Sequence, residues 1–115
     1  MPSGEEEAAR RFYRDLLGMR EVGKPRELAP RGGCWFESGA VAIHLGIERD
    51  FRPAQKAHPA LNSADYAGLV SKLRAAGIEA REARDISGVR RCHIHDPFGN
   101  RIELIDGNPR ANVSK

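Results

Sequence analysis

Residues 95–104, which read HDPFGNRIEL, contain a tight turn followed by a strand. Asp-Pro and Gly-Asn are dipeptides typical of turns, so residues 96–100 should reverse the chain. After the turn, alternation places Ile102 and Leu104 on one face of a strand and Glu103 on the other. We therefore expect Glu103 to present a carboxylate on the face that points away from the apolar core.

An earlier segment has the same layout. Apolar residues alternate over 41–47, so His44 projects from the opposite face of that strand. Gly18 lies 26 residues before His44, and Gly77 lies 26 residues before Glu103. An offset of 59 residues thus places His44 over Glu103 and predicts a duplicated module of about 60 residues.

Both halves of the chain predict helices and strands in the same order. The first half should form a helix over 4–17 and strands over 19–22, 34–36 and 41–47; the second should form a strand over 57–61, a helix over 63–76 and strands over 78–83, 89–95 and 101–105. Ser3 and Ser63 are the expected helix caps, with Gly18 and Gly77 as the ends. Residues 106–115 should form a tail.

The repeat also predicts what the first module lacks. In the second half a strand that contains His58 precedes the helix, and the same offset places its counterpart at position −1, before Met1. Module 1, about residues 1–48, should therefore begin at its helix. Module 2, about residues 56–106, should be complete, and the two together should form one domain over 1–106.

Composition excludes several classes of protein. The chain has 115 residues, a formal charge of +3 and 40% hydrophobic residues, which is enough for a packed core. It contains no apolar run long enough to span a bilayer and no secretory signal, so we expect a cytoplasmic protein. Its arginines are scattered and no nucleic-acid-binding motif is present, so neither nucleic acid nor a membrane is an expected partner.

Chemistry is expected from residues on the predicted strands. Two histidines and one carboxylate, here His44, His58 and Glu103, can hold a divalent transition metal and leave positions open for substrate. His93 and His95 form a second pair on one face of a strand. On pattern alone, histidines of this kind are more often ordinary hydrogen-bonded or surface residues than ligands. Two thiols, Cys34 and Cys92, lack a metal-binding spacing and are more typical of buried cysteines.

Two motifs resemble the vicinal oxygen chelate superfamily, which includes glyoxalase I, bleomycin and fosfomycin resistance proteins, and extradiol dioxygenases. The segment DPFGNRIEL at 96–104 is similar to its most recognisable signature, and ARRFYRDLLGM at 9–19 to its first-helix pattern. The segment KAHPAL at 56–61 looks like the entry to its second module. The resemblance covers about residues 4–106.

The resemblance implies an α+β fold of paired βαβββ modules, whose curved mixed sheets enclose a cup. It implies a divalent metal ion (Zn, Ni, Mn or Fe) held by His58, Glu103 and His44, with Glu103 as the catalytic residue that moves a proton. The metal would hold two adjacent oxygens of a small-molecule substrate, as in a lyase, isomerase or transferase. We assign substrate binding to Trp35, Phe36, Arg52 and His93, and the resemblance also implies a homodimer.

Members of the family normally begin with a strand that carries another ligand, and this chain departs from that pattern. Three explanations are open. Either the start of the chain is misplaced or truncated, or a neighbouring subunit supplies the strand, or metal chemistry has been lost. The alternative function is a metal-free protein that binds or sequesters a small molecule or drug, and an inactive remnant is a third interpretation.

Overall fold

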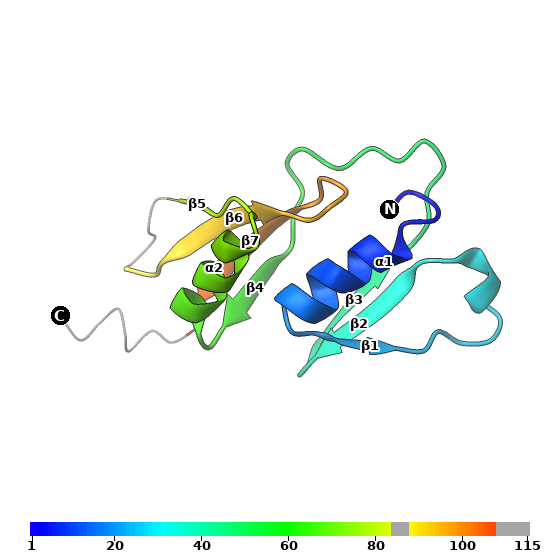
Figure 1. Ribbon diagram of the computed structural model, residues 1–115, viewed down its shortest axis with the longest axis horizontal. Coiled ribbons are helices and arrows are strands. Elements are labelled where there is room, and N and C mark those ends of the chain that lie inside the picture. Colours follow the sequence, from blue (N-terminus) through cyan, green and yellow to red (C-terminus); the bar gives the residue numbers. More distant parts are fainter. Residues whose placement is uncertain (84–87, 108–115) are drawn as a thin grey trace. The chain divides into compact units, whose positions relative to one another are not determined.

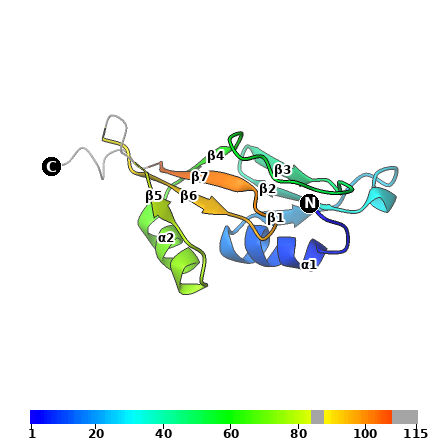
Figure 2. The same cartoon turned by 90° about the horizontal axis from the view of Figure 1, so that it is seen from above.

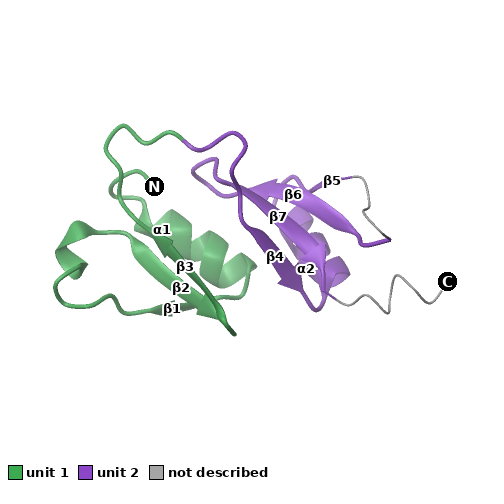
Figure 3. Ribbon diagram, turned by 180° about the vertical axis from the view of Figure 1, so that it is seen from behind, with its two compact units in different colours: residues 1–52 green, residues 53–115 purple. Residues whose placement is uncertain are grey.

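The computed structural model describes residues 1–83 and 88–107, and it divides the chain into two compact units (Figure 3). Unit 1 is Met1–Arg52 and unit 2 is Pro53–Lys115. The predicted modules 1–48 and 56–106 lie one in each unit; that they act as one domain stays a prediction. None of the described helices is long and apolar enough to cross a membrane.

Unit 1 consists of one helical segment on one face of a three-stranded antiparallel sheet (Figure 1). The helical elements are α1 (Glu6–Ala9), η1 (Arg10–Leu16) and a short 3-10 turn, η2 (Ala29–Arg31); the strands are β1 (Arg20–Val22), β2 (Cys34–Ser38) and β3 (Val41–Leu45), in the order β1-β2-β3. The predicted helix is confirmed, but its second part, η1, has wide π-helical turns, in which the Leu17 N–H donates to the Phe12 carbonyl.

Unit 2 contains a four-stranded mixed sheet covered on one face by a helix (Figure 2). Its elements are β4 (Ala60–Ser63), α2 (Tyr66–Ala75), β5 (Arg81–Glu82), β6 (Arg91–His95) and β7 (Arg101–Asp106), and the strand order is β4-β7-β6-β5. β4 is parallel to β7, whereas the other pairs are antiparallel. This is the βαβββ order expected for a module, so the α+β fold is confirmed.

Alternation along the strands separates a core face from an open face in each unit. In unit 2, Cys92, Ile94, Ile102 and Leu104 are at most 1% exposed, and they lie on the same face as the buried α2 residues Tyr66, Val70 and Leu73. In unit 1, Cys34, Phe36 and Leu45 occupy the same places beneath Phe12 and Tyr13. The opposite faces carry most of the predicted site residues.

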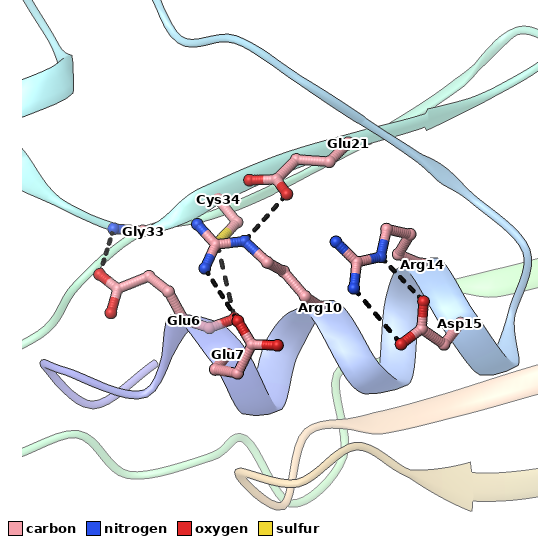
Figure 4. Close-up of polar contacts among 8 residues, drawn as sticks. All are labelled: Glu6, Glu7, Arg10, Arg14, Asp15, Glu21, Gly33 and Cys34. Carbon is pink, nitrogen blue, oxygen red and sulfur yellow. Dashed lines mark hydrogen bonds and ion pairs between the residues drawn. The ribbon is translucent and has the colours of Figure 1, made fainter.

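Both predicted helix caps are wrong. α1 begins after Glu5, which makes no side-chain cap, and Ser3 lies outside the helix. The Glu6 carboxylate instead accepts a hydrogen bond of 3.0 Å from the Gly33 N–H (Figure 4). α2 is capped by Asp65, whose side chain accepts from the Gly68 N–H at 3.1 Å, whereas Ser63 is the last residue of β4. Asp and Ser both cap helices well, so composition alone could not choose between them.

Two other predicted boundaries also shift. β4 begins at Ala60, three residues later than predicted, because Pro59 has no N–H to contribute to the sheet. β5 is reduced to two residues, since the Ile78 N–H still caps α2 by donating to the Leu73 carbonyl. The predicted tail starts inside β7 at Asp106, and beyond Gly107 it lies outside the described residues.

Among its described residues, unit 1 has no strand before α1, as the repeat predicts. Met1 nevertheless lies where the last residue of such a strand would be. The Met1 amino group donates to the Gly46 carbonyl at 2.7 Å, and the Glu48 N–H donates to the Met1 carbonyl at 3.0 Å. In unit 2 the Gly107 N–H donates to the Ser63 carbonyl in the same way. Met1 therefore pairs with the end of β3 as Ser63 pairs with β7.

The turn before β7 is held by the side chain of Asp96. Its carboxylate accepts hydrogen bonds from the N–H groups of Phe98 (2.9 Å) and Asn100 (2.8 Å) and from the Asn100 side chain (2.8 Å). Asp96 is buried, and Gly99 adopts a φ of 89°, which only glycine adopts readily. The sequence DPFGN thus fixes the register in which β6 and β7 meet.

Candidate metal centre

The central residue of the site is Glu103, in the middle of β7 on the face of the sheet that points away from α2. On β6, His93 lies directly opposite it in the antiparallel register. On the other side, Ala60 of β4 is its parallel partner, and the Glu103 N–H donates to the carbonyl of Pro59. This contact anchors the chain just beyond His58, so both imidazoles flank the same carboxylate.

The three side chains converge on one point. His58 Nε2 lies 3.0 Å from Glu103 Oε1, and His93 Nε2 lies 3.7 Å from the same oxygen. The two rings are edge to face, with centroids 5.3 Å apart. One ligand atom from each residue lies within 4.8 Å of the others, which is the spacing that a single bound ion requires. The sheet has thus placed two imidazoles and a carboxylate around one small volume.

The second ring nitrogen of His58 is also engaged. Nδ1 lies 2.7 Å from the carbonyl oxygen of Lys56, which can only accept, so Nδ1 carries a proton and donates. Metal-binding histidines are typically oriented in this way, by a hydrogen bond from the nitrogen that does not bind the metal. His58 is therefore held with Nε2 directed at the cluster.

Two arginines contact the cluster from the same face of the sheet. Arg91 Nη1 lies 3.1 Å from Glu103 Oε2, and Arg101 Nη2 lies 3.2 Å from His93 Nε2. Because a guanidinium can only donate, His93 Nε2 accepts this bond and carries a free electron pair. The cluster is thus bordered by positive charge, which satisfies the carboxylate and one imidazole.

The electrostatic environment keeps Glu103 and His93 in the forms that bind metals, whereas His58 donates to Glu103 through Nε2 and would release that proton when an ion binds. The pKa of Glu103 is lowered, first by its hydrogen bond with His58 and then by that with Arg91, so it is ionised at neutral pH. The pKa of His93 is lowered by burial and by the nearby charge of Arg101, which outweigh the opposite effect of Glu103, so it is neutral. Carboxylate and neutral imidazole are the ligand forms that divalent metals need.

These observations test whether a metal fits. Two nitrogen donors and one oxygen donor on a single face are the donor set of facial-triad sites, which suit Zn, Ni, Mn or Fe in their divalent states. The side chains of His58, His93 and Glu103 are only 24%, 16% and 12% exposed, so an ion there would be largely shielded from water. The residues of unit 2 therefore fit a divalent transition metal.

The structure brings together two of the three ligands that the sequence predicts. His58 and Glu103 lie in the cluster, and its third residue is His93, which was expected to bind substrate or to form a pair with His95. His44 lies in unit 1, where its ring stacks on Trp35 with centroids 3.6 Å apart and the planes within 1° of parallel. His44 as a ligand stays a prediction.

Other predicted site residues have varied surroundings. Phe36 is 0% exposed and stacks on Tyr13 in the core of unit 1, so its side chain fills the core rather than a substrate surface. Trp35 is half-buried on the open face of the sheet, and Arg52 is exposed at the end of unit 1. Cys34 and Cys92 are buried free thiols, as predicted, and burial raises the pKa of both.

Sequence reasoning missed His93 as a cluster member and both flanking arginines. A signal was available in the turn: a hairpin centred on Phe98 pairs residue 93 with residue 103, which is the observed register. The same alternation places Arg91 and Arg101 on the face of Glu103. Their contacts with Glu103 and His93 depend on side-chain conformation, which alternation does not give.

The family profile and the solved structures that resemble this chain point to the same family. The sequence profile of the Glyoxalase/Bleomycin resistance protein/Dioxygenase superfamily matches residues 2–104. Among solved structures, a glyoxalase family protein from Bacillus anthracis is 44% identical, with a TM-score of 0.88; the match covers 92% of this chain and 87% of that one. No protein with a curated description matches the chain.

Two more distant structures share the fold. One is a mutant of the fosfomycin resistance protein FosX from Listeria monocytogenes, solved with Mn(II) and 1S,2S-dihydroxypropylphosphonic acid (15% identity, TM-score 0.72, covering 95% of this chain and 88% of that one). The other is TnmS3, an antibiotic binding protein from Streptomyces sp. CB03234 (19% identity, TM-score 0.72, covering 92% and 89%). With the family profile spanning most of its length, this chain belongs to the glyoxalase/bleomycin resistance protein/dioxygenase superfamily.

Proposed function

We propose that this protein is a metal-dependent enzyme that acts on a small molecule through two adjacent substrate oxygens. The observation that carries the proposal is the convergence of His58, His93 and Glu103, whose ligand atoms lie within 4.8 Å of one another. The distant relative that was solved with Mn(II) and a vicinal diol supports the same chemistry. A lyase, an isomerase and a transferase are all consistent with such a site.

A divalent ion bound here would act as a Lewis acid that polarises substrate oxygens. His58 and His93 would supply neutral nitrogens, and Glu103 would supply the one negative charge of the donor set. Three protein ligands leave coordination positions open for a substrate. The half-buried site limits access of water to those positions, which strengthens electrostatic interactions inside it.

We assign proton transfer to Glu103 through Oε2. Its other oxygen, Oε1, faces both imidazoles, whereas Oε2 is held by Arg91 at 3.1 Å. The lowered pKa keeps this carboxylate charged and makes it a weak base. The proton that it accepts must therefore come from a position already made acidic by chelation of the neighbouring oxygen. The homodimer remains a prediction from the family resemblance, and the cytoplasmic location remains a prediction from the sequence.

Metal titration tests the proposal without needing a substrate. Purified protein, stripped with chelator and then incubated with Zn, Ni, Mn or Fe(II), should retain about one equivalent of one of these ions. His58→Ala and Glu103→Gln should each weaken that metal's affinity by about a hundredfold or more. His95→Ala is a matched control, because His95 is on the same face of β6 but outside the cluster.

A His44→Ala variant separates the two ligand sets. If His93 is the third ligand, His93→Ala lowers metal affinity and His44→Ala leaves it unchanged; the opposite result would restore the set predicted from sequence. Circular dichroism and thermal melting should show that each variant keeps its fold. Retention of less than about a tenth of an equivalent of every metal by the wild-type protein would overturn the proposal.

The alternative is a metal-free protein that binds a small molecule. It is favoured by one specific observation: Arg91 and Arg101 already satisfy Glu103 and His93, so the cluster is stable without an ion. The antibiotic binding protein of the same fold gives this function a precedent. Tight binding of a ligand by chelator-treated protein, unchanged when metal is added back, would establish it.

A further inference from the structure

A pocket in unit 2 adjoins the cluster of His58, His93 and Glu103 on the open face of the sheet. Its volume is about 310 Å³, at the lower end of the range for small-molecule sites. Its lining consists of side chains that are all polar or charged: Gln55, Glu79, Arg81, His93, His95 and Arg101. His93 belongs to both the pocket and the cluster, so a molecule in the pocket lies next to the position of the ion.

The strand register brings the two arginines of the pocket to opposite sides of β6. Arg81 on β5 is the partner of His93, and Arg101 on β7 is the partner of His95. All four side chains project from the same face of the sheet. The two guanidiniums therefore flank a pair of imidazoles, an arrangement rich in hydrogen-bond donors.

The positive charge of these arginines is weakly neutralised. Within residues 1–83 and 88–107, Arg101 has no carboxylate at ion-pair distance, and its polar contact is with His93. Arg81 pairs with Glu79 at 3.5 Å, but both side chains are about 80% exposed. Exposed pairs of this kind contribute little, since water screens them. The pocket thus offers two guanidiniums to an incoming anion.

We propose that this pocket binds an oxyanion, such as a carboxylate, phosphate or phosphonate, that is part of the ligand whose other oxygens reach His58, His93 and Glu103. Guanidinium groups recognise such oxyanions through paired, charge-assisted hydrogen bonds. The inference rests on the proposed function and narrows its substrate class to small anionic molecules. An uncharged ligand would leave the positive charge of both guanidiniums as weakly neutralised as before.

Arg101 also links the two halves of this site. Its Nη2 donates to His93 Nε2, the nitrogen whose electron pair a metal ion would take. A bound ion would displace this hydrogen bond and free the guanidinium for the oxyanion. Metal and oxyanion should therefore bind with positive coupling, and by linkage each should raise the affinity of the other.

Calorimetric titration with sulfate at constant ionic strength, with and without saturating Zn, tests the inference on the full chain. We expect wild-type protein to bind sulfate with a Kd of about millimolar or tighter, and several-fold more tightly with Zn. Arg101→Gln should weaken sulfate binding about tenfold and Arg81→Gln less, because Arg101 is the more buried of the two. Acetate in place of sulfate shows whether the site prefers a carboxylate.

Controls separate this inference from the function on which it rests. Lys72→Gln removes the same charge from α2, which covers the other face of the sheet, and should leave sulfate binding unchanged. Arg101→Lys retains charge but not the paired donors, and should give an intermediate loss. Melting curves establish that each variant folds, and Zn affinity should be retained or increased in Arg101→Gln.

Each result has one interpretation. If Zn binds but sulfate does not, or if Arg101→Gln binds sulfate as the wild type does, the oxyanion pocket is wrong and the metal centre stands. If sulfate binding depends on Arg101 in the metal-free protein but no metal binds, the pocket stands and the proposed enzyme is wrong.

Discussion

The same two positions of the sheet carry different chemistry in the two units. In unit 1, Trp35 on β2 pairs with His44 on β3, and the two rings stack. In unit 2, His93 on β6 pairs with Glu103 on β7, and together with His58 they form the metal-type cluster. One hairpin therefore presents an aromatic platform where the other presents ligand atoms.

The core faces of the two hairpins differ much less. Cys34 opposite Leu45 in unit 1 corresponds to Cys92 opposite Leu104 in unit 2, and all four are buried. Because core positions must fill a fixed volume, they tolerate little change, whereas positions on the open face can vary without disturbing the packing. The two units therefore share their core packing and differ in the side chains on the open face of the sheet.

The third member of the cluster, His58, depends on a strand that unit 1 contains only in part. His58 is positioned by the pairing of Pro59 and β4 with β7. In unit 1 the corresponding edge of β3 pairs with Met1, which takes the place of Ser63, five residues after His58. Within its described residues, unit 1 thus has no counterpart of the His58 side chain.

The largest expected effect tests the equivalence of the two cores. Phe36 and Ile94 occupy corresponding positions and are both 0% exposed. Phe36→Ala should lower the free energy of unfolding by about 3–5 kcal/mol and Ile94→Ala by about 2–5 kcal/mol, because each leaves a cavity. Chemical denaturation measures both. A loss below about 1 kcal/mol at either position would show that the two core positions are not equivalent.

The next prediction exchanges the chemistry of the open faces. His93→Trp places in unit 2 the residue type found at the equivalent position of unit 1, and should lower metal affinity about a hundredfold, which is about 2.7 kcal/mol. In that background, Trp35→His should not restore binding, since among the described residues His44 belongs to no group of converging ligand atoms. Wild-type metal affinity in His93→Trp would show that His93 is not a ligand.

A third prediction compares the two turns. Asp96 and Ser38 are equivalent, but Asp96 is buried and accepts three hydrogen bonds whereas Ser38 is exposed. Asp96→Ala should cost about 2–3 kcal/mol, because it leaves three partly buried donors without their acceptor. Ser38→Ala should change stability by less than about 0.5 kcal/mol. Thermal unfolding of both variants gives the comparison, and equal effects would contradict it.

The smallest expected effect concerns pH. The pKa of Glu6 is lowered from its usual 4.5, first by the hydrogen bond from Gly33. A depressed pKa in the folded state means that this stabilisation, about 1 kcal/mol or less, is complete above pH 4.5 and is lost as the pH falls through the lowered pKa. In Glu6→Gln, unfolding free energies between pH 6 and pH 3 should therefore decrease less steeply. Parallel curves for the two proteins would rule out this role of Glu6.

Much of the fold could be predicted because its signals are local. The turn 96–100, the alternation around Glu103 and the apolar spacing of both helices depend on near neighbours along the chain. The internal repeat also predicted the order of the helices and strands and the missing first strand of module 1. Helix caps and the start of β4 could not be predicted, because several suitable residues stand within a few positions and tertiary contacts choose among them.

The candidate site was predictable only in part for the same reason. By itself the sequence determined the two-module α+β fold, the family, and the presence of Glu103 on a strand and His58 close to another strand of the same module. Only the tertiary structure decided that His93 completes the cluster, that Arg91 and Arg101 border it, and that His44 stacks on Trp35. Ligand atoms from residues 45 positions apart converge through strand pairing and side-chain conformation, and neither is encoded in short-range spacing.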